Sequence, residues 1–223
     1  TFNLMQRRIR EQVSQRARML GAVSHDLRTP LSRLKLRLEQ IDDMRLQGQM
    51  RHDLDDMIGM LDATLSYLHE QRTGESRQWL DVQALVQSLS ENAQDQGADV
   101  QCLGQSAPLQ VQPMALRSCL NNLIDNALRY AGHNATVTVG VHALDDNDVE
   151  LYVEDNGPGV PDDVMPRLGE RFFRAPGTAA SGTGLGLAIA HEAVEHFGGR
   201  LSFLNRPGGG LKVAITLPLL KAP

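Results

Sequence analysis

The first third of the chain carries a regular apolar repeat, in which apolar residues recur at alternating steps of three and four. The repeat runs through Leu20, Val23, Leu27, Leu31, Leu34, Leu38 and Ile41. Such spacing places an apolar seam along a helix and is typical of helices packed as in a coiled coil. After a break at residues 47–49 the same spacing resumes through Leu54, Ile58, Leu61, Leu65 and Leu68. Two helices folded back on each other bury only part of these seams. The sequence therefore predicts an all-α helical hairpin that forms a dimeric four-helix bundle.

His25 lies off this seam. At about 100° per residue it stands roughly 200° around the helix from Val23, which directs its imidazole towards solvent. Asp26 is adjacent, Thr29 follows one helical turn later on the same face, and Pro30 removes a backbone hydrogen bond and loosens the helix. An exposed imidazole beside a carboxylate and a hydroxyl does not contribute to packing, so this group of side chains indicates a chemical role. For the His-Asp pair alone, a solvated histidine on a charged face is an equally good interpretation.

Composition limits the classes of protein to which the chain can belong. With 223 residues and 41% hydrophobic content, the chain is long enough for one or two domains with a core. A net charge of −5 and an aromatic content of 4% argue against direct binding of nucleic acid, which requires a basic surface. Cys102 and Cys119 form neither a disulfide framework nor a metal-ligand spacing, so we expect a reducing compartment. We expect neither a membrane helix nor a signal peptide, because no apolar run reaches roughly 18 residues.

A hinge is predicted over residues 72–79. The rest of the chain is rich in glycine, with segments in which β-branched residues alternate with others and with helical patterns of ordinary length. Helices are predicted over residues 80–96, 113–131 and 184–197. Pro113 suits the first position of the second helix, and Gly132 closes it. Strands are predicted over residues 100–103, 109–111, 136–143, 149–154, 201–204 and 211–217, the last four as two hairpins. Because helices and strands do not alternate strictly, the sequence predicts an α+β two-layer sandwich.

The helix predicted after Pro113 carries two asparagines four residues apart, Asn122 and Asn126, on the face opposite its apolar residues. Two carboxamide oxygens on one face suit a hard cation such as Mg²⁺, which keeps most of its waters and binds phosphates. Arg129 on the same helix can reach a phosphate group with its planar guanidinium. An ordinary polar helix face is the alternative interpretation of the two asparagines.

A first glycine segment, Glu154-Asp155-Asn156-Gly157-Pro158-Gly159, follows a predicted strand. Its glycines permit close approach of a ligand to the backbone. Asp155 can accept a hydrogen bond from an exocyclic amine such as that of adenine. Taken alone, the segment also fits an ordinary Asp-Asn-Gly turn.

A second glycine segment, Gly182-Thr183-Gly184-Leu185-Gly186, opens a predicted helix. Backbone amides at the start of a helix, with no Cβ in the way, favour an anion. The segment matches neither the dinucleotide fingerprint nor a Walker loop. Residues 175–181, rich in Gly, Ala, Ser and Thr, precede it and are expected to be flexible and to become ordered when a ligand binds.

Together these segments resemble those of two-component sensor histidine kinases. Residues 24–31, Ser-His-Asp-Leu-Arg-Thr-Pro-Leu, are similar to the phosphoacceptor box of the subclass in which a His-Asp-x-x-Thr pattern accompanies both kinase and phosphatase activity. The asparagine helix, the two glycine segments and Arg171-Phe172-Phe173-Arg174 between them resemble the N, G1, G2 and F boxes of the ATP-binding domain. That domain has the Bergerat fold, shared with gyrase, Hsp90 and MutL-type ATPases. The likeness covers nearly the whole chain, and the order of the boxes makes it specific.

The resemblance implies an ATP site with Mg²⁺ as the cofactor. Asn126, together with Asn122, would hold the metal, and Arg129 and Arg174 would meet phosphate. Tyr130 would pack beside the nucleotide and Asp155 would bind the adenine amine. The pocket and the phosphate loop would be formed by Gly157, Gly159, Gly182, Thr183, Gly184, Leu185 and Gly186.

Two features depart from the family pattern. Gly169 stands where an aromatic residue is common, which leaves docking of the lid to Phe172 and Phe173. The lid also carries no Lys or Arg between Arg174 and the second glycine segment, so Arg174 and Arg129 have to balance the charge of the phosphates.

The resemblance further implies a reaction. His25 would take the γ-phosphoryl group of ATP while Asp26 orients the imidazole, and would pass it to an aspartate in the receiver domain of a response regulator. Thr29 would position a water molecule in the reverse, phosphatase role.

The same resemblance implies a domain order and a location. It implies a homodimer, with residues 1–10 as the end of a HAMP signalling helix, 11–71 as the dimerisation and phosphotransfer hairpin, and 80–223 as the catalytic domain. It places the chain in the cytoplasmic portion of a bacterial inner-membrane protein, with a membrane sensor segment upstream.

Two other classes stay open. Clamp ATPases of the Hsp90 and MutL kind hydrolyse ATP with a glutamate where this chain has Asn122, and that difference, with His25, favours transfer over hydrolysis. A non-catalytic dimeric signalling scaffold requires damaged ATP motifs, whereas these are whole apart from Gly169. The balance between kinase and phosphatase is not predicted, since both use the same residues.

Overall fold

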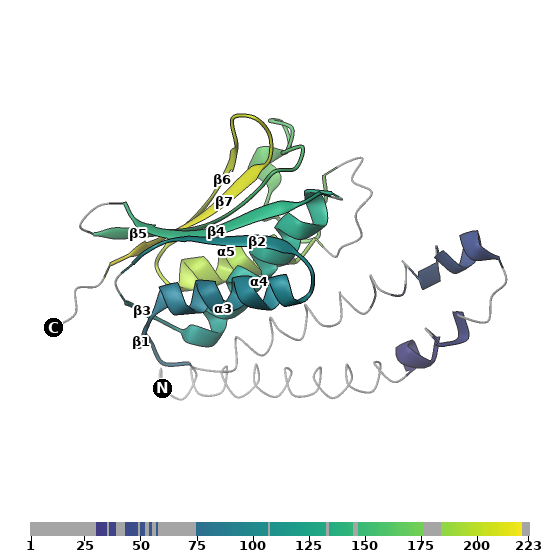
Figure 1. Cartoon of the computed structure of the whole chain (residues 1–223), viewed down its shortest axis with the longest axis horizontal. Helices are drawn as coiled ribbons and strands as arrows, with labels where there is room; N and C mark the ends of the chain where they lie inside the picture. Colours follow the sequence, from purple (N-terminus) through teal and green to yellow (C-terminus); the bar gives the residue numbers. More distant parts are fainter. Residues whose placement is uncertain are drawn as a thin grey trace, which may run out of the picture. The chain divides into compact units, whose positions relative to one another are not determined.

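The structure is a computed structural model of the chain, and it divides into two compact units with a boundary between Gly74 and Glu75 (Figure 1). It describes residues 30–34, 36–38, 43–48, 50–51, 54, 57, 75–106, 108–132, 134–144, 147–175 and 184–219. No helix within these ranges is long and apolar enough to cross a membrane.

The first unit contains short helical stretches between residues 30 and 57 among those described. Leu31, Leu38 and Leu54 are buried in one cluster, as the apolar repeat predicts. Leu34, on the same predicted seam, is 47% exposed in the single chain. His25, Asp26 and Thr29 lie outside the described residues, and the dimeric four-helix bundle stays a prediction.

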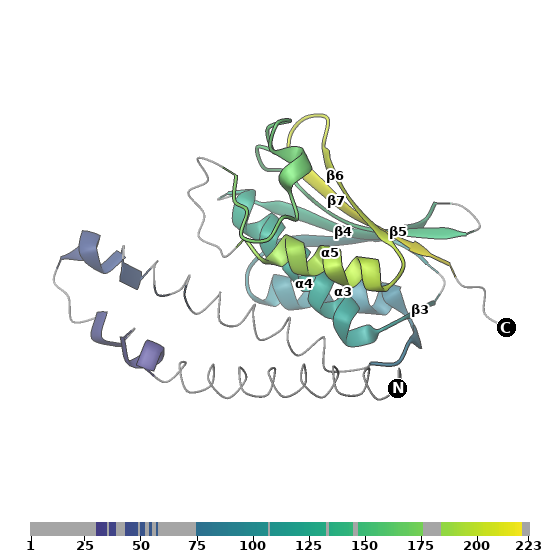
Figure 2. The same ribbon diagram turned by 180° about the vertical axis from the view of Figure 1, so that it is seen from behind.

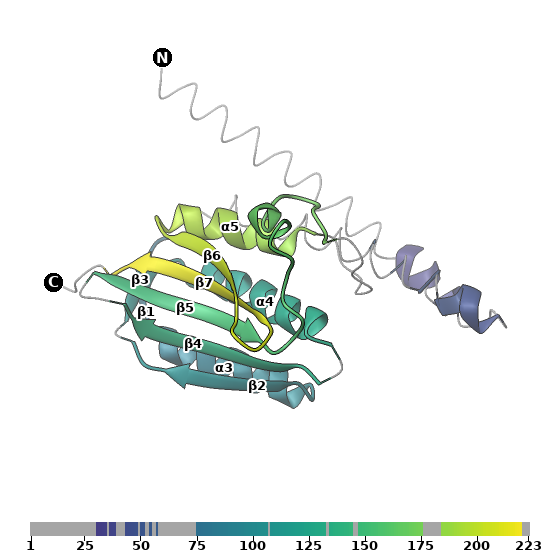
Figure 3. The ribbon, with the colours of Figure 1, turned by 90° about the horizontal axis from the view of Figure 1, so that it is seen from above.

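The second unit is a two-layer sandwich, which confirms the α+β prediction for this part of the chain. A five-stranded sheet in the order β2-β4-β5-β7-β6 has α3, α4 and α5 against one face (Figures 2 and 3). Its strands are β2 (Asp99–Gly104), β4 (Thr136–Ala143), β5 (Asp148–Asp155), β6 (Arg200–Asn205) and β7 (Leu211–Pro218). The helices are α3 (Val82–Asp95), α4 (Pro113–Tyr130) and α5 (Gly186–His196). Two short strands, β1 (Gln78–Leu80) and β3 (Leu109–Val111), pair separately, and a 3₁₀ turn, η1, spans Met165–Arg167.

The sheet is antiparallel except for the β2–β4 pair, which is parallel. Along the central strand β5, buried and half-buried residues alternate, as expected for a strand with one covered face. Leu151 at its middle is fully buried and stands opposite Val141 of β4 and Ile215 of β7. The core of the unit lies between this face and the three helices.

Local residues mark the starts of α3 and α4. The Asp81 side chain accepts a hydrogen bond from the Ala84 amide at 3.0 Å and starts α3, and Pro113 occupies the first turn of α4, as predicted. The predicted start of the first of these helices at residue 80 is wrong, because residues 78–80 form β1 and pair with β3. The predicted start of the last helix at residue 184 is also too early, since α5 begins at Gly186.

Candidate functional site

The polar face of α4 and the start of α5 form one side of the candidate site. Asn122 and Asn126 are half-buried, whereas Leu120 and Leu123 on the opposite face of α4 are fully buried. A β-carbon on Gly186 would lie 3.9 Å from Cβ of Asn122, which places the beginning of α5 beside the asparagines. The start of α5 therefore lies beside Asn122 on the polar face of α4.

The start of α5 is suited to an anion. Leu185 occupies the N-cap position and makes no side-chain cap hydrogen bond. The first amides of a helix without a side-chain cap point out of the helix and carry partial positive charge, which favours phosphate. Gly186 adds no side chain here, and among the described residues the only atom that its β-carbon would meet within 4 Å is Cβ of Asn122. Gly182 and Thr183 lie outside the described residues.

Asp155, the last residue of β5, provides a fixed carboxylate. It is 6% exposed, and its Oδ1 accepts hydrogen bonds from the backbone amides of Gly157 at 2.8 Å and Leu211 at 3.3 Å. The other oxygen, Oδ2, accepts no hydrogen bond from the described part of the chain, and it is not among the fully enclosed side-chain atoms there. One oxygen is thus held by the backbone while the second can accept a hydrogen bond from a ligand, and its binding of the adenine amine stays a prediction.

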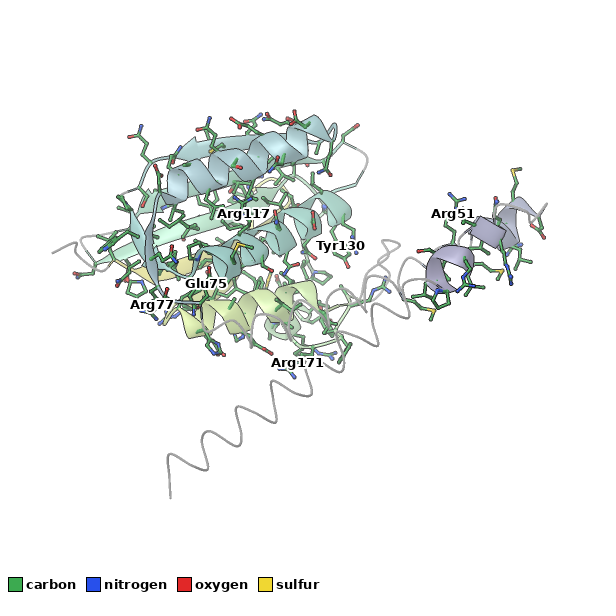
Figure 4. The ribbon with its side chains drawn as sticks, turned by 90° about the horizontal axis from the view of Figure 1, so that it is seen from below. Arg51, Glu75, Arg77, Arg117, Tyr130 and Arg171 are labelled. Atoms are coloured by element: carbon green, nitrogen blue, oxygen red, sulfur yellow. The ribbon has the colours of Figure 1, made fainter. Side chains whose placement is uncertain are left out.

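Gly157 and Gly159 allow the loop after β5 to pack closely. A β-carbon on Gly157 would lie 2.7 Å from Cα of Ala131 and 2.9 Å from Oδ1 of Asp155, so any larger residue would push the loop away from the end of α4. Gly159 has φ of +73°, which favours glycine. The two predicted glycines therefore bring Asp155 next to the C-terminal end of α4, where Tyr130 is half-buried and Arg129 is exposed (Figure 4).

The β6–β7 hairpin holds the Asp155 loop from the other side, and sequence reasoning missed this role. Arg206 donates a hydrogen bond to the Asp155 carbonyl at 2.8 Å, and its Nε lies 3.4 Å from Oε2 of Glu154. The Asn205 side chain both accepts from the Val160 amide and donates to the Val160 carbonyl. The glycine triplet 208–210 marks the turn in the sequence, but its position beside Asp155 depends on the pairing of β5 with β7.

The base of the predicted lid is anchored to the second glycine segment. The Phe172 amide donates to the Gly184 carbonyl at 3.0 Å, and Phe172 itself has φ of +62° and a side chain that is 67% exposed. Arg171 is paired with Glu192 of α5 (Figure 4). The Arg167 guanidinium stacks over the Phe173 ring at 4.1 Å. Phe173 is thus fixed, while Phe172 is presented to solvent.

Gly169 has a structural reason in this chain. Its φ of +92° lies in the left-handed region, where an aromatic side chain would be strained. A β-carbon there would face the Phe203 ring at 3.8 Å. Glycine at this position therefore suits the left-handed turn before the lid.

The residues present fit a Mg²⁺–phosphate complex better than a metal bound by the protein alone. Among the described residues there is no group of three or more His, Cys, Asp or Glu side chains that could enclose a metal ion. The half-buried oxygens of Asn122 and Asn126 offer a few neutral donors beside an anion site, which suits a cation that retains waters and phosphate oxygens. Reduced hydration raises the pKa of Asp125 on the same helix, and the Arg129 guanidinium offsets part of that rise.

Comparisons with known proteins agree with this geometry. Residues 111–221 match the family described as histidine kinase-, DNA gyrase B- and HSP90-like ATPases. The second unit carries a domain of this ATPase family. The sensor histidine kinase GtrS of Pseudomonas aeruginosa is 37% identical over 222 residues, which cover 98% of this chain and 45% of GtrS. The sensor histidine kinase CpxA of Escherichia coli strain K12 is 30% identical over 243 residues, which cover 99% of this chain and 51% of CpxA.

A solved structure supports the same assignment. The mycobacterial sensor histidine kinase MprB superposes with a TM-score of 0.58 at 27% identity, covering 65% of this chain and 100% of that chain. Within the ATPase family, these similarities support a histidine kinase catalytic domain in the second unit. The chain spans about half the length of the curated relatives it matches.

Proposed function

We propose that the chain is the catalytic core of a sensor histidine kinase, which phosphorylates His25 from ATP and passes the phosphoryl group to an aspartate of a response regulator. One observation above all supports this. Asn122 stands beside the start of α5, in the position where the clamp ATPases of the resembled family carry a water-activating glutamate. A carboxamide there can hold a cation but cannot remove a proton from water, so transfer is favoured over hydrolysis.

In this proposal the catalytic domain binds and orients ATP. Oδ2 of Asp155 accepts a hydrogen bond from the adenine amine, and the first amides of α5 bind the phosphates with help from Arg129 and Arg174. Asn126 and Asn122 hold Mg²⁺, which when bound offsets the charge that develops on the transferring phosphoryl group.

His25 is the proposed nucleophile. A neutral ring nitrogen forms a bond to the γ-phosphorus while the bond from phosphorus to the oxygen of the departing ADP breaks, and Asp26 accepts the proton from the other nitrogen. The phosphoryl group then moves to the carboxylate of the regulator and the imidazole regains a proton. In the opposite role, Thr29 positions water for removal of phosphate from the regulator.

The proposed function also includes the predicted hinge, homodimer and membrane location. His25 and the ATP site belong to different domains, so the catalytic domain has to approach the hairpin of the same or the partner subunit by motion at the predicted hinge. The working unit is a homodimer, attached to a HAMP helix and a membrane sensor segment upstream, with the core on the cytoplasmic side of a bacterial inner membrane.

In the decisive experiment, the full chain is incubated with Mg²⁺ and ATP that carries a radioactive label on its γ-phosphate. Wild type is compared with His25→Gln and with a matched control, His52→Gln. We expect acid-labile, alkali-stable label on wild type and control and none on His25→Gln, with nucleotide binding unchanged in all three. Release of inorganic phosphate without labelled protein, unaffected by His25→Gln, would instead establish a clamp-type ATPase. Absence of both label and nucleotide binding would point to a scaffold.

A further inference from the structure

Glu75, at the start of the second unit, caps helix α4. Its carboxylate oxygens accept hydrogen bonds from the amides of Met114, at 2.9 Å, and Ala115, at 3.3 Å. The Gln112 side chain in turn donates to the Glu75 carbonyl at 2.7 Å. These contacts tie Glu75 to a helix that begins almost 40 positions later in the chain.

Helix α4 needs this external cap. Gln112 at its N-cap position makes no side-chain cap hydrogen bond, and Pro113 has no amide hydrogen. The amides of Met114 and Ala115 would otherwise lack an acceptor within the helix. A carboxylate satisfies them and also lies at the end of the helix where its dipole favours negative charge.

Arg77 does the converse at helix α5. Its Nη2 donates to the carbonyls of His196 and Phe197, both at 3.3 Å, where α5 ends. Carbonyls at the C-terminal end of a helix lack partners, and a cation there is favoured by the dipole. Glu75 and Arg77, two residues apart, therefore each carry the charge opposite to the partial charge of the helix end that they contact.

These two helix ends lie together because α4 and α5 run in opposite directions. Figure 4 shows Glu75 and Arg77 at one end of the helix pair and Tyr130 at the other. The 18 residues of α4 span about 27 Å, so the two ends are far apart. Glu75 and Arg77 thus contact the helix pair at the end opposite to the candidate nucleotide site (Figure 4). Glu75 and Arg77 themselves precede residues 111–221, which match the ATPase family.

We propose that Glu75 and Arg77 form a clasp that positions the catalytic domain for phosphoryl transfer. The clasp docks the end of the interdomain linker on α4 and α5, so that the predicted hinge stops before Glu75 and the linker moves the two helices of the ATP site as one body. Release of the clasp would add flexible residues to the hinge, and β1, paired with β3, would become the first fixed point. This inference rests on the proposed function for its catalytic consequence, but not for the contacts themselves.

The test uses the full chain and the variants Glu75→Ala, Arg77→Ala and the double variant. Matched controls are Glu91→Ala on α3 and Arg200→Ala on β6, which remove the same charges from exposed positions of the same unit. Glu75→Gln, which keeps the shape of the side chain and one carbonyl acceptor, serves as a milder variant if Glu75→Ala unfolds. Each protein is measured for amide hydrogen exchange, for binding of a fluorescent ATP analogue with Mg²⁺, and for the rate of label transfer from ATP to histidine.

We expect Glu75→Ala to accelerate exchange of the Met114 and Ala115 amides about fivefold or more, because a lost cap leaves them open to water. The Kd of the nucleotide should stay within about twofold of wild type, while histidine phosphorylation slows severalfold, most in the double variant, and the controls behave as wild type.

Unchanged exchange would refute the clasp. Faster exchange with an unchanged rate of phosphorylation would refute its role in transfer. A parallel loss of nucleotide affinity would show that the residues support the site itself and not the position of the domain. If wild type takes no label at all, the proposed function fails, whereas the exchange result still decides whether the clasp exists.

Discussion

Replacing Asp155 by asparagine should change which purine the catalytic domain binds without unfolding it. Oδ1 of Asp155 accepts hydrogen bonds from two backbone amides, those of Gly157 and Leu211. An asparagine can keep its single oxygen in that position and retain both hydrogen bonds. Its amide nitrogen then occupies the place of Oδ2 and offers a donor where the aspartate offers an acceptor.

The size of the effect follows from that exchange of donor for acceptor. The adenine amine loses a hydrogen bond to a charged acceptor, worth about 1.5–3 kcal/mol, and meets a donor in its place. The Kd for ATP should therefore rise about 10- to 150-fold. Inosine triphosphate carries a carbonyl oxygen where ATP carries the amine, so the variant should lose much less affinity for it. The free energy of unfolding should fall by only about 1 kcal/mol.

Titration calorimetry with ATP and inosine triphosphate, with Mg²⁺ present, measures both constants. Asp148→Asn makes the same substitution at the opposite end of β5 and should bind ATP as wild type does. Thermal unfolding of each protein separates loss of binding from loss of fold. The reasoning is refuted if folded Asp155→Asn binds ATP normally, or if its affinities for the two nucleotides fall by the same factor.

Three further predictions concern other residues of the second unit. Arg206→Ala removes the hydrogen bond to the Asp155 carbonyl and should lower the free energy of unfolding by about 1 kcal/mol, measured in urea, and weaken ATP binding severalfold. Gly184→Ala places a β-carbon 2.7 Å from the Phe173 carbonyl oxygen at φ of +67°. Backbone strain and this contact together should lower the free energy of unfolding by about 1–3 kcal/mol in the same urea assay. Burial and the Glu91 carboxylate raise the pKa of the Cys102 thiol. Alkylation of Cys102 should therefore reach half its maximal rate at a higher pH than for a free thiol, and Glu91→Gln should shift that midpoint downwards.

The elements that depend on local sequence were predicted well. The helix after Pro113 and the strand at 136–143 appear at the expected places, because a proline at the first helical turn and β-branched alternation act within a few residues. The β4–β5 and β6–β7 hairpins follow from turns that join adjacent segments. Strand β1 was missed because three residues show no periodicity, and its strand geometry comes from pairing with β3.

The site was predicted as a set of residues but not as an arrangement. Asn122, Asn126, Asp155 and the glycines each gave a local signal, and the structure brings those that it describes to one edge of the unit. The part played by Arg206 needed the β5–β7 pairing, which joins strands separated by more than 50 residues. The parallel β2–β4 pair is likewise non-local, and the periodicity of neither strand predicts it.

The two ends of the α4–α5 pair follow one electrostatic rule. At the nucleotide end, α5 presents its positive N-terminus to the predicted phosphates, while α4 presents its negative C-terminal end near the asparagines predicted to hold a cation. At the other end the dipoles are reversed, and the clasp supplies a carboxylate to α4 and a guanidinium to α5. The dipoles of the antiparallel helices therefore favour opposite charges at each end of the pair. The proposed nucleotide would meet this preference on one side, and Glu75 and Arg77 meet it on the other. The segment that precedes the domain is thus attached to the same two helices that are proposed to hold its substrate.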